Sequence, residues 1–62
     1  MQIFVNGSLI DVNEGITIRE AIKKIGENPE IYIVARNGEI THENEALREG
    51  DKLDLVKIIS GG

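Results

Sequence analysis

The first thirteen residues alternate between apolar and polar side chains. In residues 1–6 the odd positions are apolar, a period of two that predicts a half-buried strand. Asn6-Gly7 then provides a favoured two-residue hairpin turn. Residues 8–13 continue the alternation, with Ile10 and Val12 on either side of Asp11. The chain is therefore predicted to open with a β-hairpin.

The pattern changes to a helical period at residue 17. The Thr17 hydroxyl can accept a hydrogen bond from the N–H of Glu20, whose carboxylate can reach back, which forms a capping box. Gly26 is expected just past the end of the helix, and Pro29 prevents its continuation. The apolar stripe at positions i, i+3, i+4 and i+7 consists of Ile18, Ala21, Ile22 and Ile25. The charged side chains expected to point to solvent are Arg19, Lys23 and Lys24.

Further strands are predicted in the second half of the chain. Residues 31–36 are rich in β-branched side chains and end at Asn37-Gly38, a second tight turn. A short strand is expected near residues 39–41. The last strand, residues 53–58, is expected to be central because it is so apolar.

Between the last two strands the sequence loses its periodicity. We expect an irregular crossover in which Ala46 and Leu47 anchor the chain to the core, followed by a turn at residues 49–51. The acidic run of residues 39–51 is interpreted as a solvated face that could also contact a basic partner.

The order of elements, ββαββ, predicts an α+β fold. A mixed sheet of four to five strands with one helix packed across it covers every apolar face, which is the β-grasp architecture. Residues 1–58 are expected to form this domain. Residues 59–62 are expected to form a flexible C-terminal tail.

Composition limits the chemistry that the chain can perform. A chain of 62 residues buries only about 60% of its unfolded surface, which leaves no room for an enclosed active site. Cysteine is absent, which excludes disulfides, thiolate metal sites and a cysteine nucleophile. We therefore expect a carrier or binding module that is not an enzyme and binds no cofactor or metal itself.

Charge and hydropathy limit its partners. Eleven acidic and seven basic residues give a net charge of −4, which disfavours nucleic acid. Residues 1–13 show no leader pattern, and no apolar stretch approaches membrane-spanning length, so a cytoplasmic location without membrane contact is expected.

The chain ends in Ile59-Ser60-Gly61-Gly62. A diglycine lacks Cβ atoms, so it can enter a channel too narrow for side chains and present the Gly62 carboxylate inside a partner's active site. The alternative interpretation is an ordinary frayed terminus.

In this context the sequence resembles the ubiquitin-like sulfur carriers of the ThiS and MoaD type. The family's acidic-Gly-Asp turn and following strand match residues 50–53, and its terminal diglycine matches Gly61 and Gly62. Residues 34–39 read Val-Ala-Arg-Asn-Gly-Glu, which is similar to a stretch common in members of the thiamine pathway.

The resemblance implies that the Gly62 carboxylate is adenylated by an E1-like enzyme of the ThiF or MoeB type, which uses ATP. A sulfur donor, such as a cysteine desulfurase or rhodanese-like protein, then converts the adenylate to a thiocarboxylate. A sulfur-accepting synthase consumes the sulfur, with the thiazole of thiamine favoured as the product.

Three alternatives remain open. One is a MoaD-like carrier for molybdopterin synthesis, for which the Ser-Gly-Gly ending is equally suitable. Another is a protein modifier joined to lysines through Gly62. The third is a β-grasp interaction module whose tail has no role.

A docking surface is predicted on the sheet. Alternation places Leu53 and Leu55 in the core and leaves Val56 and Ile58 on the outer face, where we expect them beside Phe4 of a neighbouring strand. Such a patch next to the tail would guide it into a partner.

Two further residues invite a chemical interpretation. His42 is followed by Glu43 and Glu45, but one imidazole with flexible carboxylates lacks the ligand set of a zinc site. Ser60 has no positioned base and is interpreted as a small tail residue rather than a nucleophile.

Overall fold

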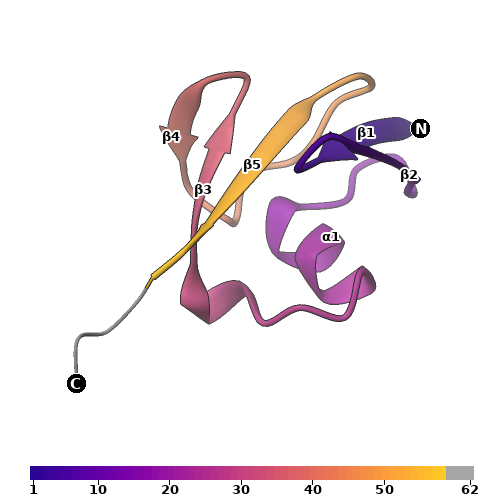
Figure 1. Cartoon of the computed structure of the whole chain (residues 1–62). Coiled ribbons are helices and arrows are strands. Elements are labelled where there is room, and N and C mark those ends of the chain that lie inside the picture. Colours follow the sequence, from indigo (N-terminus) through magenta and orange to yellow (C-terminus); the bar gives the residue numbers. More distant parts are fainter. Residues whose placement is uncertain (59–62) are drawn as a thin grey trace.

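The computed structural model describes residues 1–58, which form a five-stranded mixed sheet with a helix packed across one face (Figure 1). The order across the sheet is β2-β1-β5-β3-β4. The strands are β1 (Gln2–Val5), β2 (Ser8–Asp11), β3 (Tyr32–Arg36), β4 (Glu39–Thr41) and β5 (Lys52–Lys57). The predicted β-grasp fold is confirmed. Because the short segment at residues 39–41 is a regular strand, the order is ββαβββ rather than ββαββ.

The first hairpin forms as predicted. Strands β1 and β2 pair antiparallel, with Phe4 opposite Leu9. Asn6 and Gly7 have φ angles of 49° and 84°, the two positive values that a type I′ turn requires. The return strand ends at residue 11 instead of 13, although Val12 is still buried in the core.

Helix α1 (Ile18–Lys24) begins at the predicted capping box. The Thr17 hydroxyl accepts from the Glu20 N–H at 3.2 Å, and the Glu20 carboxylate accepts from the Thr17 N–H at 3.0 Å. The Thr17 hydroxyl also donates to the Glu20 carboxylate at 3.0 Å. The bond from the Thr17 backbone N–H, and after it the one from the hydroxyl, lower the pKa of Glu20. At the other end, the Gly26 N–H donates to the Lys23 carbonyl and the Glu27 N–H to the Ile22 carbonyl, which is the Schellman arrangement.

Two expectations about α1 are corrected. Ile25 is the C-cap residue and is exposed, so the buried stripe ends one turn earlier than its spacing indicated. Arg19 does not point freely to solvent. Its guanidinium lies 2.6 Å from the Glu43 carboxylate and 3.5 Å from that of Glu30.

The segment before β3 is a short 3-10 helix, η1 (Pro29–Ile31), so the strand starts at residue 32 instead of 31. Strands β3 and β4 then form an antiparallel hairpin around the Asn37-Gly38 turn, where φ is 51° and 88°.

Strand β5 is central, as predicted, and starts one residue earlier than expected. It runs parallel to β1, with Val5 opposite Leu53, and antiparallel to β3, with Val34 opposite Leu55. The first half of β5 is therefore hydrogen-bonded on both edges, and β3 continues the pairing along its other half as far as Lys57.

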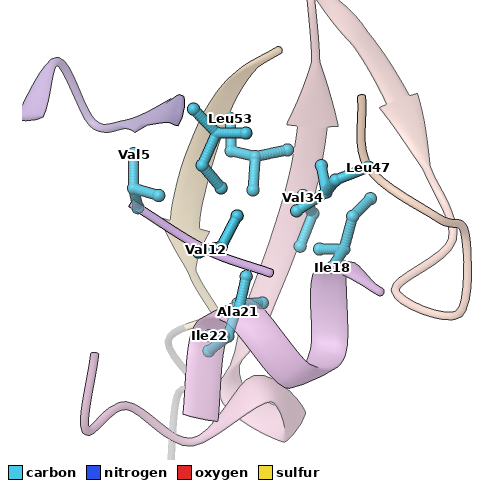
Figure 2. Close-up of a cluster of buried hydrophobic side chains, with 9 residues drawn as sticks. Val5, Val12, Ile18, Ala21, Ile22, Val34, Leu47 and Leu53 are labelled. Atoms are coloured by element: carbon cyan, nitrogen blue, oxygen red, sulfur yellow. The ribbon is translucent and has the colours of Figure 1, made fainter. Parts of the chain in front are cut away.

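The core lies between the sheet and α1 (Figure 2). Its buried residues are Ile3, Val5, Val12, Ile18, Ala21, Ile22, Val34, Leu47 and Leu53. Leu47 anchors the crossover as predicted, but Ala46 is exposed and contributes through its backbone, which forms a bridge to Thr17 and accepts a hydrogen bond from Arg36. None of the helices in residues 1–58 reaches the length and hydrophobicity that a membrane crossing requires.

Candidate functional site

The described chain ends at a fixed point on the sheet. Lys57 is the last paired residue of β5, opposite Tyr32, and the Ile58 N–H donates to the Ile31 carbonyl at 2.7 Å. This end of β5 lies across the molecule from the N-terminus (Figure 1). The predicted tail residues Ile59, Ser60, Gly61 and Gly62 lie outside the described residues.

The sheet face opposite α1 carries a group of exposed apolar side chains near this point. Val56 and Ile33 are paired neighbours on β5 and β3, and Ile40 pairs with Ala35 on the same face. We call this group the exit patch. Its members, with their exposed fractions, are Val56 (59%), Ile58 (50%), Ile33 (44%) and Ile40 (79%).

The predicted position of Phe4 beside Val56 is wrong. Phe4 is on the same outer face, but the parallel register places it opposite Lys52, four residues and about 13 Å from Val56. Its apolar partner is Leu9 on β2, which is 53% exposed. Phe4 and Leu9 form a second group, which we call the hairpin patch. An open hollow of about 370 Å³ adjoins it, lined by Phe4, Gly7, Lys52, Leu53 and Asp54.

Two charged side chains separate the patches. Lys52 and Asp54 are both exposed, and they occupy consecutive outward positions of β5. Their opposite charges leave the centre of the outer face close to neutral, although the whole chain carries −4.

The start of β5 is fixed by a buried carboxylate that the sequence analysis placed on a solvated face. Asp51 is 8% exposed and accepts from the Arg48 N–H at 2.9 Å and the Asn37 side-chain amide at 3.1 Å. The Arg36 guanidinium lies 4.0 Å away. A buried carboxylate needs such partners because an unpaired one would lose its hydration without compensation.

The middle of β5 is held by Asn6. Its side-chain oxygen accepts from the Leu55 N–H at 2.8 Å, and its backbone N–H donates to the Leu53 carbonyl at 2.9 Å. The turn residue therefore extends the β1–β5 pairing beyond the end of β1. The spacing of 49 residues explains why no local pattern indicated this contact.

Tyr32 pairs with Lys57 at the same end of β5. The Tyr32 hydroxyl donates to the Glu27 carboxylate at 2.9 Å. This hydrogen bond is the main cause that raises the pKa of Tyr32, because the nearby carboxylate disfavours the phenolate.

The two glutamates that follow His42 are engaged in hydrogen bonds within the fold. His42 is exposed, Glu43 accepts from Arg19, and Glu45 accepts from the Thr41 hydroxyl at 2.6 Å. The hydrogen bond that Arg19 donates to Glu43 is the main cause that raises the pKa of Arg19. Within residues 1–58 no group of three or more His, Cys, Asp or Glu side chains is placed to hold a metal ion.

The fold and its free-standing sheet face define a ubiquitin-like β-grasp protein. Two solved structures share this fold over nearly the whole chain. The thiamine biosynthesis protein ThiS of Geobacter metallireducens has a TM-score of 0.78 at 23% identity, with both chains fully covered. SAMP1 of Haloferax volcanii has a TM-score of 0.68 at 26% identity, covering 98% of this chain and 97% of that one.

The sequence gives the narrower assignment. Residues 2–62 match the ThiS family. The sulfur carrier protein TtuB of Thermus thermophilus is 32% identical over 53 residues, which cover 86% of this chain and 82% of the relative. The chain belongs to the ThiS family, and the resemblance to ubiquitin-like sulfur carriers is confirmed.

Proposed function

We propose that the protein is a sulfur carrier whose cargo is held on the Gly62 carboxylate as a thiocarboxylate. The observation that carries this proposal is a ThiS-family sequence that ends in Ser60-Gly61-Gly62, a few residues beyond a rigid central strand. The relative named a sulfur carrier protein supports it.

The proposed chemistry needs two steps, both on a partner. The Gly62 carboxylate attacks the α-phosphorus of ATP, and pyrophosphate leaves, because a free carboxylate is a poor electrophile. The terminal sulfur of a donor persulfide then attacks the acyl carbon and AMP leaves. A thiol supplies two electrons to cleave the resulting acyl disulfide, which releases the thiocarboxylate and a new disulfide.

The activating enzyme is proposed to dock on the outer sheet face. The exit patch and Phe4 supply apolar area, and Val56 and Ile58 lie at the end of β5 from which the tail continues. An acidic carrier with these side chains fits a partner surface that combines an apolar centre with basic groups around it. Such a partner also supplies the charges that stabilise the α-phosphate.

We propose thiazole synthesis in the thiamine pathway as the destination of the sulfur. The Val-Ala-Arg-Asn-Gly-Glu stretch of residues 34–39 and the match to the ThiS family support this choice. In a strain that lacks its endogenous thiazole sulfur carrier, the wild-type gene is expected to restore growth without thiamine, and a variant lacking Gly62 is not. Rescue of molybdopterin synthesis alone would contradict the thiamine assignment.

The adenylation step has its own test. With the cognate adenylating enzyme, the wild-type chain is expected to support exchange of labelled pyrophosphate into ATP. The chain that lacks Gly61 and Gly62 is the matched control, because residues 1–58 are unchanged. Equal exchange with both chains, or none with the wild-type chain and a proven cognate enzyme, would contradict the proposal.

A further inference from the structure

The outer sheet face has a pattern that matches its own copy. One row across the strands contains Leu9, Phe4 and Lys52, and the row two residues further along β5 contains Asp54, Ala35 and Ile40. Val56 and Ile33 form the row after that. The hairpin patch and the exit patch therefore lie diagonally on opposite sides of Lys52 and Asp54.

Standard strand dimensions place these groups at matching distances. Rows two residues apart are about 6.6 Å apart, and neighbouring strands are about 4.8 Å apart. Consider a line in the plane of the sheet that runs diagonally to the strands and crosses β5 between Lys52 and Asp54. The hairpin patch lies on one side of this line and the exit patch on the other, at similar distances from it. Lys52 and Asp54 lie at similar, shorter distances from the same line.

We propose that this face binds a second copy of the chain. A two-fold axis along that diagonal, between two outer faces, places each hairpin patch against the exit patch of the other copy. It also brings Lys52 of each copy toward Asp54 of the other, so the ion pair forms twice, as an isologous contact requires. The strands of the two sheets cross at nearly a right angle, which is one of the two usual ways in which sheets pack face to face.

Charge on the rest of the molecule favours this face over the others. The acidic residues Glu20, Glu30, Glu43 and Glu45 belong to α1, η1 and the crossover, and none of them is on a strand that carries the outer face. Two copies of a chain with a net charge of −4 repel each other over most of their surfaces. The central part of the outer face, where Lys52 balances Asp54, avoids that repulsion.

Self-association would have a consequence for activation, and this consequence alone rests on the proposed function. The second copy covers Phe4, Val56 and Ile58, where the activating enzyme is proposed to dock. The dimer would therefore act as a reserve from which only the dissociated chain is adenylated.

Sedimentation velocity of the full chain, with no enzyme present, tests the dimer separately from the sulfur-carrier role. Between micromolar and millimolar concentration the wild-type chain is expected to pass from monomer to dimer. Lys52→Asp and Asp54→Lys each place like charges opposite each other, so each is expected to weaken the dimer about tenfold or more. Lys23→Asp, on exposed helix surface, is the matched control and should leave dimerisation close to that of the wild-type chain.

Mixing the two charge variants is the decisive experiment. In a mixed dimer, the carboxylate introduced by Lys52→Asp would meet the ammonium introduced by Asp54→Lys, and the Lys52 and Asp54 side chains that the variants retain would meet as in the wild-type dimer. The mixture is therefore expected to dimerise about as well as the wild-type chain, although each variant alone is weak. A wild-type chain that stays monomeric overturns the proposal and leaves the face to a different protein. A dimer for which mixing restores nothing overturns the proposed geometry.

Discussion

The Asp51 carboxylate joins three segments of the chain at the start of β5. It accepts from the Arg48 N–H in the preceding turn and from Asn37 in the β3–β4 turn, and it lies near Arg36 at the end of β3. Arg36 also donates to the Ala46 carbonyl at 3.0 Å. A single buried side chain therefore fixes the position at which the central strand begins.

Replacing Asp51 by Ala should destabilise the protein. The substitution leaves the Arg48 N–H and the Asn37 amide without their acceptor, so the free energy of unfolding should fall by about 1–3 kcal/mol. Urea unfolding measures the change. Asp54→Ala removes an exposed carboxylate from the same strand and should change stability by about 0.5 kcal/mol or less. Equal losses for both variants would contradict the role given to Asp51.

Tyr32 should titrate above the ordinary pKa of tyrosine. It is the only tyrosine and the chain has no tryptophan, so phenolate absorbance reports on it alone. Because its folded pKa is raised, the bond to Glu27 stabilises the fold below the unfolded pKa, and that stabilisation is lost as the pH rises through the folded pKa. Glu27→Gln removes the carboxylate charge and should lower the pKa of Tyr32. An unchanged titration in that variant would exclude Glu27 as the cause.

Residue-level features were predictable from the sequence when their partners were near in the chain. The Thr17–Glu20 cap, the glycine after α1 and the two Asn-Gly turns depend on residues within a few positions of each other. Asn6 depends on a partner 49 positions away, and Asp51 accepts from Asn37, 14 positions away, as well as from nearby Arg48. Nothing in the local pattern around Asp51 indicated that it would be buried, since it follows a glycine in an acidic segment.

At the scale of elements, the stability of the short helix α1 comes from its capped ends and from its packing against the core. A helix of seven residues is marginal by itself, so α1 is held by burial of Ile18, Ala21 and Ile22 and by its two caps. The cap at Thr17 also stands at the bridge to Ala46, where the crossover meets the helix.

Thr17→Ala should therefore cost about 1 kcal/mol of stability, because the Glu20 N–H loses its acceptor. The loss should appear in chemical unfolding as a lower midpoint with an unchanged slope. Ser8→Ala, which removes an exposed hydroxyl from β2, is the control and should change the midpoint little. If the two variants unfold alike, the capping box contributes nothing measurable.

Element boundaries were predictable to within two residues, and the departures have physical causes. The 3-10 turn at Pro29 displaced the start of β3 because proline sets the first position of such a turn. Ile25 matched the helical spacing, but α1 ended before it, since Gly26 adopts a positive φ of 85° and closes the helix there.

At the scale of the whole molecule, α1 covers one face of the sheet (Figure 1), and the other face carries exposed apolar side chains. The sequence was sufficient to predict the fold, the central position of the last strand and the outward direction of Val56 and Ile58. It was not sufficient to place Phe4, because the register between β1 and β5 is set by pairing across the sheet. Ile33 and Ile40 were missed for the same reason, although the alternation of Ile33 with buried Val34 was a usable signal.

Docking of the activating enzyme on this face can be tested with Val56→Asp. The side chain is 59% exposed, so the variant should fold, but a charge in the apolar contact should raise the KM for the carrier about tenfold or more. The KM is obtained from adenylation rates, measured at carrier concentrations at which the wild-type chain is monomeric. Lys23→Asp again provides a control on the helix surface. An unchanged KM for Val56→Asp would place the enzyme elsewhere.

The measurement that tests the central claim most directly is the intact mass of the protein with its native C-terminus. It is taken before and after incubation with the cognate adenylating enzyme, ATP and a persulfide donor. Replacement of one oxygen by sulfur should add about 16 Da, and the gain should be absent when Gly62 is deleted. An unchanged mass with a proven cognate enzyme and donor, or the same gain without Gly62, would contradict the account.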